Sequence, residues 1–215
     1  MNIIIGGGKY GCYAVEHLRQ KSKGFVVVDT DPNCLAVRRF GLAASRQSLS
    51  NGEHFVQGDL STVLDLIEKL KPEYVFPTAP VHIAADLAKI KFALDPWTEA
   101  INAILLKLPE VVVLAAGKGK LVTSFNRDKS CVEKCSMPPI CPSTHMRKPC
   151  TMTELIRFAS PDAFILISHS MAPGMGALKG SELLDFFNWA RQREKFVVAT
   201  TCDCHGVLDA FQKRI

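Results

Sequence analysis

The chain has 215 residues, of which 47% are hydrophobic, and it carries a formal net charge of +5 at pH 7. This length suits one α/β domain, and the apolar share is enough to cover both faces of a sheet. The charge is mild, and no basic stripe is interleaved with aromatic residues, so a nucleic acid is not the expected partner.

The first predicted element is a strand at residues 3–5, which breaks into glycines at Gly6, Gly8 and Gly11 before a helical pattern that runs to Leu18. Strand, glycine turn and helix in this order are the context in which a GxGxxG pattern predicts dinucleotide binding. Gly6 would allow the tight turn, Gly8 the approach of a pyrophosphate, and Gly11 the close packing of helix on strand. The amides and dipole of the helix start would then face the phosphates.

A second apolar run, residues 25–28, has strand composition and ends at Asp29. Together these elements resemble the first βαβ unit of Rossmann-type NAD(P)-binding proteins, and the resemblance implies that Asp29 binds the ribose hydroxyls of the cofactor. Asp29 would repel a 2′-phosphate, and Arg38 and Arg39 lie about two helical turns further on, so NAD is favoured over NADP. The alternative is that Asp29 only begins a turn in which Asp31 caps the next helix.

Further apolar runs alternate with helical patterns along the rest of the chain. The expected strands are residues 54–56, 74–76, 111–115, 121–125, 163–168 and 196–200, and the expected helices include residues 81–94 and 151–159. This alternation predicts right-handed crossovers and a doubly wound, mostly parallel sheet of the Rossmann-like α/β class. We expect residues 1–215 to form a single domain.

The expected strand at residues 74–76 is followed by Thr78 and His82. The stretch is similar to the corresponding strand end in nicotinamide dehydrogenases and in the nucleotide-binding regulatory domains of bacterial potassium transport. That similarity implies that Thr78 lies near the ribose and nicotinamide side of the cofactor. His82 would then face a redox site, and the alternative is a histidine that is satisfied locally at a helix start.

The longest apolar stretch, around residues 100–116, is interrupted by Lys107, Pro109 and Glu110, which argues against a membrane span. The apolar start of the chain is too short for a signal peptide and has no positively charged leader, so we expect a cytoplasmic protein. Eight cysteines in such a protein indicate metal or redox chemistry before structural disulfides.

Residues 124–151 form an expected excursion loop, rich in Cys, Pro, Lys and Arg and without strand or helix periodicity. Loops of this length are usually functional. The thiols of Cys131, Cys135, Cys141 and Cys150 are soft ligands that suit zinc or an iron–sulfur cluster. Their spacing matches neither the CxxC pairs of zinc ribbons nor the bacterial ferredoxin run. We favour an iron–sulfur cluster over zinc, with redox-active or simple disulfides and unliganded thiols as alternatives.

A second cysteine group, with Cys202, Cys204 and His205, follows the last expected strand. Because the cysteine loop also follows a strand, the two groups could meet at one edge of the sheet. Cys202 and Cys204 would then add metal ligands or form an exchangeable thiol pair, or they could be small buried hydrophobic residues.

Two functions are compatible with these patterns. The first is a dinucleotide-binding redox protein or oxidoreductase that has a cysteine-ligated metal centre and exchanges electrons with its cofactor or a partner protein. The second is a regulatory module that senses NAD or another adenine nucleotide, with a structural zinc or no metal. The sequence names no catalytic acid or base, and a homodimer through an open sheet edge is compatible with both.

Overall fold

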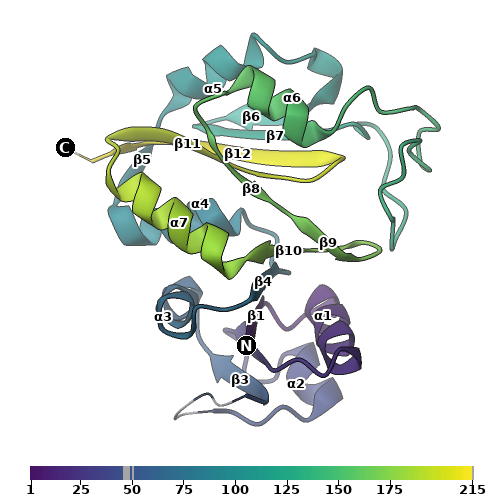
Figure 1. Ribbon diagram of the computed structural model, residues 1–215, viewed down its shortest axis with the longest axis vertical. Coiled ribbons are helices and arrows are strands. Elements are labelled where there is room, and N and C mark those ends of the chain that lie inside the picture. The colour runs from purple at the N-terminus through teal and green to yellow at the C-terminus, as the bar shows by residue number, and fades with distance from the viewer. Residues whose placement is uncertain (46–48, 50, 215) are drawn as a thin grey trace. The chain divides into compact units, whose positions relative to one another are not determined.

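The computed structural model describes residues 1–45, 49 and 51–214 (Figure 1). The chain divides into two compact units, each with its own sheet. Unit 1 comprises Met1–Leu87 and Ser170–Asp185, and unit 2 comprises Ala88–His169 and Phe186–Ile215. Within the described residues, every helix is too short or too polar to cross a membrane.

The sheet of unit 1 has the strand order β3-β2-β1-β4-β10-β9. Its strands are β1 (Asn2–Ile5), β2 (Phe25–Asp29), β3 (Glu53–Gln57), β4 (Tyr74–Pro77), β9 (His169–Ala172) and β10 (Met175–Lys179). The first four strands are parallel to their neighbours, and β10 is antiparallel to β4. The β-branched and aromatic residues of β1 and β2 are buried, as expected for central strands with both faces covered.

Three helices connect the parallel strands of unit 1: α1 (Lys9–Gln20), α2 (Leu35–Phe40) and α3 (Leu60–Leu70). In Figure 1, α1 and α2 lie on one side of the strands and α3 on the other. The apolar face of α1, with Cys12, Val15 and Leu18, joins the core around Ile4 and Phe76. The helix α4 (Ile83–Phe92) follows β4 and runs into unit 2.

The sheet of unit 2 has the order β6-β7-β12-β11-β8, with β5 also paired to β12. Its strands are β5 (Leu94–Pro96), β6 (Val113–Gly117), β7 (Lys120–Ser124), β8 (Phe164–Ile167), β11 (Lys195–Thr201) and β12 (His205–Lys213). Strands β8 and β11 are parallel, and the other pairs are antiparallel.

The helices α5 (Thr98–Leu105) and α6 (Met152–Ala159) both contact β12, and Figure 1 shows them on the same side of this sheet. Ile104, Met152, Ile156 and Leu208 belong to the core beneath them. A 3₁₀ turn (Glu110–Val112) precedes β6, and α7 (Gly180–Arg191) begins in unit 1 and ends in unit 2.

The α/β class is confirmed, but the structure has two sheets of mixed strand direction instead of one mostly parallel sheet. The reason lies in the connections of the second half. A two-residue turn at Lys118 and Gly119, both with positive φ, joins β6 to β7, and residues 202–204 join β11 to β12. Such short connections produce antiparallel hairpins, whereas parallel pairs need a crossover. The single domain expected for residues 1–215 corresponds in the structure to two compact units.

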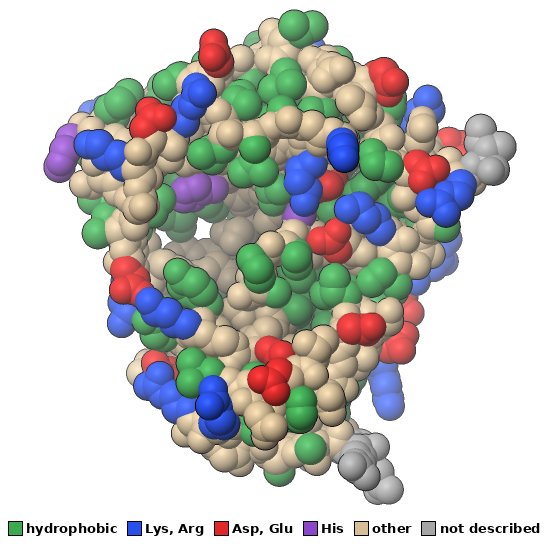
Figure 2. All heavy atoms as spheres, turned by 180° about the vertical axis from the view of Figure 1, so that it is seen from behind, with side chains coloured by type: hydrophobic (Ala, Val, Ile, Leu, Met, Phe, Trp, Pro, Cys, Tyr) green, Lys and Arg blue, Asp and Glu red, His purple; other side chains and the backbone are tan. Residues whose placement is uncertain are grey.

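Positive and negative side chains alternate over the face seen in Figure 2, and the described residues form no extended patch of one sign there. This distribution agrees with the mild net charge of the chain.

Candidate functional site

The glycine turn of unit 1 lies between β1 and α1, at the carboxyl ends of the parallel strands. Strand β1 leads through α1 to β2 on one side, while the chain reaches β4 on its other side through α3. The carboxyl ends of β1 and β4 are therefore the place where the strand order reverses. In open α/β sheets, ligands bind at such a point.

The three glycines of the pattern differ in what surrounds them. Gly6 has a φ of +100°, which side chains rarely adopt, and a Cβ at Gly11 would overlap the carbonyl oxygen of Gly6. A Cβ at Gly8 would meet nothing within 4 Å. The fold therefore requires glycine at two of these positions, and the third leaves open space above the turn.

The start of α1 is open in the same place. Gly8 is its N-cap residue, and neither a side-chain cap nor an acidic residue in the first turn is found among the described residues. The first amides of a helix have no partner within the helix and carry the positive end of its dipole. An anion bound over Gly8 would receive hydrogen bonds from these amides.

Asp29 is tied to this turn. Its Oδ2 accepts a hydrogen bond from the amide of Gly7 at 2.6 Å, and its Oδ1 accepts one from the amide of Asp31 at 2.9 Å. A carboxylate oxygen has two acceptor positions, so each oxygen can still bind a hydroxyl. Gly7, which the sequence pattern left unassigned, is closed on its other side by buried Cys34, against which any Cβ would clash. The run of three glycines was its only signal in the sequence.

Thr78 supports the turn from β4. Its hydroxyl is within hydrogen-bond distance of the carbonyl oxygens of Ile5 (2.9 Å) and Gly6 (2.8 Å), to which it donates. The hydroxyl proton of Thr78 is thus directed to the turn, so the hydroxyl oxygen can interact with a ligand only by accepting a hydrogen bond from it. His82 is buried near the start of α4, where its carbonyl accepts the amide of Asp86.

Unit 2 contains six of the eight cysteines, and all eight are free thiols. They are Cys131, Cys135, Cys141 and Cys150 in the loop and Cys202 and Cys204 in the turn between β11 and β12. The loop meets this turn, since Lys148 and Cys131 of the loop both contact residues of 202–205.

His205 lies between two of these thiols. The Sγ of Cys131 is 3.5 Å from its Nε2, and the Sγ of Cys202 is 3.7 Å from its Nδ1. Desolvation of the ring and the charge of Lys148 lower the pKa of His205, which favours the neutral imidazole that metals bind. The sequence had placed His205 in the second cysteine group without a partner.

Asn126 also contacts Cys131, and no sequence motif pointed to this residue. Its Nδ2 donates to the Sγ of Cys131 at 3.3 Å, while its buried Oδ1 has no hydrogen-bond partner among the described residues.

Lys148 links Cys204 to the segment of the loop that holds Cys135. Its Nζ donates to the Sγ of Cys204 at 3.2 Å and to the carbonyl of Met137 at 3.0 Å, and the amide of Met137 donates to the Sγ of Cys135 at 3.3 Å. Burial raises the pKa of Cys204, and Lys148 opposes this effect. Cys135 and Cys202 are close enough to raise that pKa further.

No hydrogen bond joins Cys141 or Cys150 to His205 or Lys148 among the described residues. Cys141 is in the turn closed by the bridge between Ile140 and Arg147, and a hydrogen bond from the side chain of Thr144, followed by backbone amides, lowers its pKa. That Cys131, Cys135, Cys141 and Cys150 form one ligand set stays a prediction. Among the described residues, no three His, Cys, Asp or Glu side chains are arranged to hold a metal ion.

Comparisons with known proteins match both halves of the chain. A family model described as an uncharacterized protein's N-terminal domain, AF_1314_N, matches residues 1–83, and the corresponding C-terminal model, AF_1314_C, matches residues 82–214. A protein of Archaeoglobus fulgidus described as an uncharacterized protein is 47% identical over 215 residues, which cover 99% of this chain and 100% of that protein. No solved structure matches.

Proposed function

The chain belongs to the AF_1314 family, whose descriptions name no activity, and from the geometry of its own residues we propose that it is a dinucleotide-binding redox protein. Its N-terminal half would be a Rossmann-like unit that binds NAD(H) over the glycine turn. The parallel order β3-β2-β1-β4 supports this proposal, since it is the order of the first mononucleotide-binding half of that fold together with the strand that follows it.

One observation carries the proposal: the open position of Gly8 next to the crowded position of Gly11. Packing alone would require glycine at Gly11 and would leave Gly8 free to be any residue. A pyrophosphate that approaches the backbone and the amides of α1 explains the glycine at position 8, which packing leaves unexplained.

The preference for NAD(H) over NADP(H) rests on Asp29. Its carboxylate is held beside the turn by Gly7 and Asp31, where it would accept the ribose hydroxyls and repel a 2′-phosphate. Arg39 is paired with Glu16, which leaves it less available to bind that phosphate.

Calorimetric titration with NAD, NADH, NADP and NADPH tests this proposal. We expect NAD or NADH to bind and the 2′-phosphorylated forms to bind at least about tenfold more weakly, which corresponds to about 1.4 kcal/mol. Absence of binding for all four nucleotides would contradict dinucleotide binding. Equal binding of both classes would contradict only the role of Asp29.

The thiol cluster of unit 2 favours redox work over sensing alone. We propose that Cys131 and His205 are the first two ligands of a metal centre, either zinc or an iron–sulfur cluster. Ligand atoms on a tetrahedral zinc, with bonds of about 2.3 Å to sulfur and about 2.0 Å to nitrogen, lie about 3.5 Å apart. The observed separation of 3.5 Å fits this geometry for the pair. Further ligands would come from neighbouring thiols after a movement of the loop.

Elemental analysis of protein purified without oxygen tests the metal proposal. We expect iron or zinc in the wild type, with iron and sulfide giving a brown colour, and loss of the metal in Cys131→Ser and His205→Gln. Cys150→Ser is the matched control, because no hydrogen bond joins Cys150 to this pair among the described residues. A metal-free wild type that still binds NAD(H) would favour the nucleotide-sensing module instead.

A further inference from the structure

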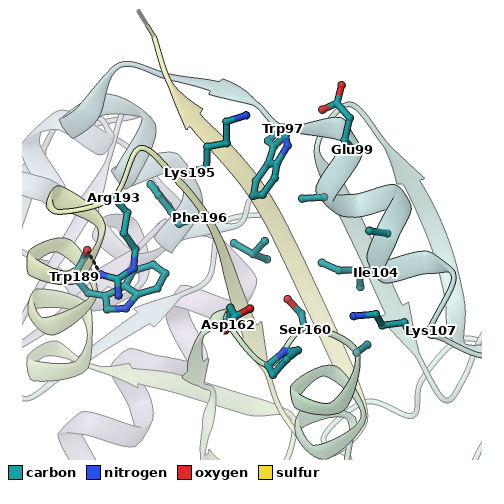
Figure 3. Close-up of a pocket in the computed structure, with 15 residues that line it drawn as sticks. Trp97, Glu99, Ile104, Lys107, Ser160, Asp162, Trp189, Arg193, Lys195 and Phe196 are labelled. Carbon is teal, nitrogen blue, oxygen red and sulfur yellow. Dashed lines mark hydrogen bonds between the residues drawn. The ribbon is translucent and has the colours of Figure 1, made fainter.

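Unit 2 contains a pocket of about 430 Å³ that shares no residue with the glycine turn or the cysteine cluster (Figure 3). The residues that line it come from α5 and the positions next to its two ends, from the end of α7, from the start of β11 and from the segments that follow α6 and α7. The chain has two tryptophans, and both Trp97 and Trp189 line this pocket. Its size is within the range of small-molecule sites, about 300–1,000 Å³.

Arg193 is held in place against Trp189. Its guanidinium carbon lies 4.0 Å from the centroid of the indole, and its Nη1 donates to the carbonyl of Trp189 at 3.0 Å. The indole is itself packed against Phe164 and Phe196, with ring centroids 5.3 Å and 5.8 Å away. Stacking orders the guanidinium and leaves most of its five N–H donors for other partners.

A similar pair lies on the other side of the pocket. The Nζ of Lys195 is 5.3 Å from the ring centroid of half-buried Trp97. Figure 3 shows the indole of Trp97 above Ile104, which belongs to the apolar floor. An aromatic ring could therefore contact apolar and aromatic surface while remaining close to a cation.

Positive charge dominates the groups that line the pocket. Lys107, Arg193 and Lys195 contribute cations, and none of them forms an ion pair with another described residue. In Figure 3 the amine of Lys107 points toward Ser160, whereas the carboxylate of Glu99 points away from the other lining groups. Asp162 is the remaining carboxylate. The pocket thus presents an unpaired positive charge beside an aromatic and aliphatic surface.

We propose that this pocket binds a small planar aromatic anion. The ring would lie against Trp97 and Ile104, and its carboxylate or phosphate would bind Arg193 together with Lys107 or Lys195. Two kinds of molecule share this chemistry, nucleoside monophosphates and aryl carboxylic acids. The proposal is independent of dinucleotide binding in unit 1.

Intrinsic fluorescence tests the proposal directly, because both tryptophans are in the pocket. The probes are AMP, 4-hydroxybenzoate, neutral adenosine and inorganic phosphate, each titrated into the wild type and into Gly8→Val. AMP could also bind over the glycine turn. The Gly8→Val variant blocks that turn, so a response that it retains comes from the pocket in unit 2. We expect saturable changes with AMP or 4-hydroxybenzoate in both proteins, and at least about tenfold weaker responses to adenosine and phosphate.

Variants of the cations locate the site. Arg193→Gln and Lys195→Gln should each weaken binding about tenfold, the loss expected for one charge-assisted hydrogen bond. Arg191→Gln, which removes an exposed cation outside the pocket, should leave it unchanged. Lys195 is exposed, so its replacement keeps the test valid if Arg193→Gln disturbs the packing of Trp189. No response to either anion, an equal response to adenosine, or full affinity in both cation variants would overturn the proposal. The anion that binds identifies the class of ligand.

Discussion

The amide of Gly7 donates a 2.6 Å hydrogen bond to the Oδ2 of Asp29. This bond joins the glycine turn after β1 to the end of β2, and it fixes the carboxylate beside the open start of α1. Thr78 completes the arrangement from β4 through the carbonyls of Ile5 and Gly6. Three neighbouring strand ends therefore hold one turn, and rigid support of this kind is what a precise binding site needs.

Replacing Asp29 by Asn removes the negative charge and one of the two acceptors. The amide oxygen could still accept from Gly7, but the NH2 group cannot accept from the amide of Asp31, and the charge that excludes a 2′-phosphate would be lost. We expect NAD(H) affinity to fall about tenfold or more, as for a lost bond to a charged group, and the preference over NADP(H) to narrow. Asp31→Asn is the control, since the carboxylate of Asp31 accepts a hydrogen bond from the amide of Asn33 within its own turn. A variant with unchanged selectivity would rule out the role of Asp29.

Replacing Gly11 by Ala tests the packing requirement. The added methyl group would overlap the backbone oxygen of Gly6, and backbone cannot move away as a flexible side chain can. We expect the free energy of unfolding in urea to fall by about 2–3 kcal/mol, as for an overpacked core. Gly8→Ala should cost about 1 kcal/mol or less, the effect of alanine at an N-cap. Equal losses in the two variants would contradict the different roles of these glycines.

Cys141 should be the most rapidly alkylated thiol of the reduced, metal-free protein at neutral pH. The hydrogen bond from Thr144 and nearby amides lower its pKa, whereas burial raises the pKa of Cys12 and Cys34. A lowered pKa increases the thiolate fraction, and the thiolate is the reacting form. Iodoacetamide labelling followed by peptide mass spectrometry measures the rates. Thr144→Val should slow labelling of Cys141 and move its pH profile upward, without changing Cys150.

The capping box of α6 should contribute to stability in a pH-dependent way. Thr151 and Glu154 exchange hydrogen bonds across the first turn, and these bonds, the backbone amide of Thr151 first, lower the pKa of Glu154. Thr151→Ala should reduce the free energy of unfolding by about 1 kcal/mol. A carboxyl whose pKa is lowered by folding stabilises the folded protein at pH values above its pKa in the unfolded chain. This stabilisation is lost as the pH falls through the pKa in the folded protein.

The difference between wild type and Thr151→Ala should therefore be largest near neutral pH and should shrink in acid. Urea unfolding at several pH values measures it. A difference that stays constant down to the acid limit of the folded protein would show that the hydroxyl of Thr151 does not stabilise ionised Glu154, since the variant keeps the amide of residue 151.

The elements around the glycine turn were predictable because their signals are local. A β-branched run, closely spaced glycines and an acidic residue after the next apolar run are all visible within the first 30 residues. The long strand β12 (His205–Lys213) was missed. It pairs with β7, β11 and β5 and is buried on both faces, so it shows no alternation, and buried Asp209 interrupts its apolar run. Asp209 is compatible with this position because Lys120 lies 3.8 Å away on β7.

The cysteine cluster shows the same limit of local patterns. The sequence grouped Cys131 with the cysteines nearest to it in the chain. In the structure its contact is His205, 74 residues away, and the hairpin that brings them together depends on pairing in the sheet of unit 2. Because both cysteine groups follow strands, the sequence did suggest that the loop could meet residues 202–205, but it did not identify which side chains would be in contact.

Titration of NADH into the wild type and into Gly8→Val shows whether the dinucleotide binds over the glycine turn. Gly8 has a φ of −78° and open space around its missing Cβ, so valine should leave the fold intact by circular dichroism. Gly52→Ala, with only the ring of His54 nearby, is the control at the other end of the strands. We expect Gly8→Val to lose NADH binding, whereas the wild type and Gly52→Ala retain it. Equal NADH affinity in folded Gly8→Val would show that the dinucleotide does not bind over this turn.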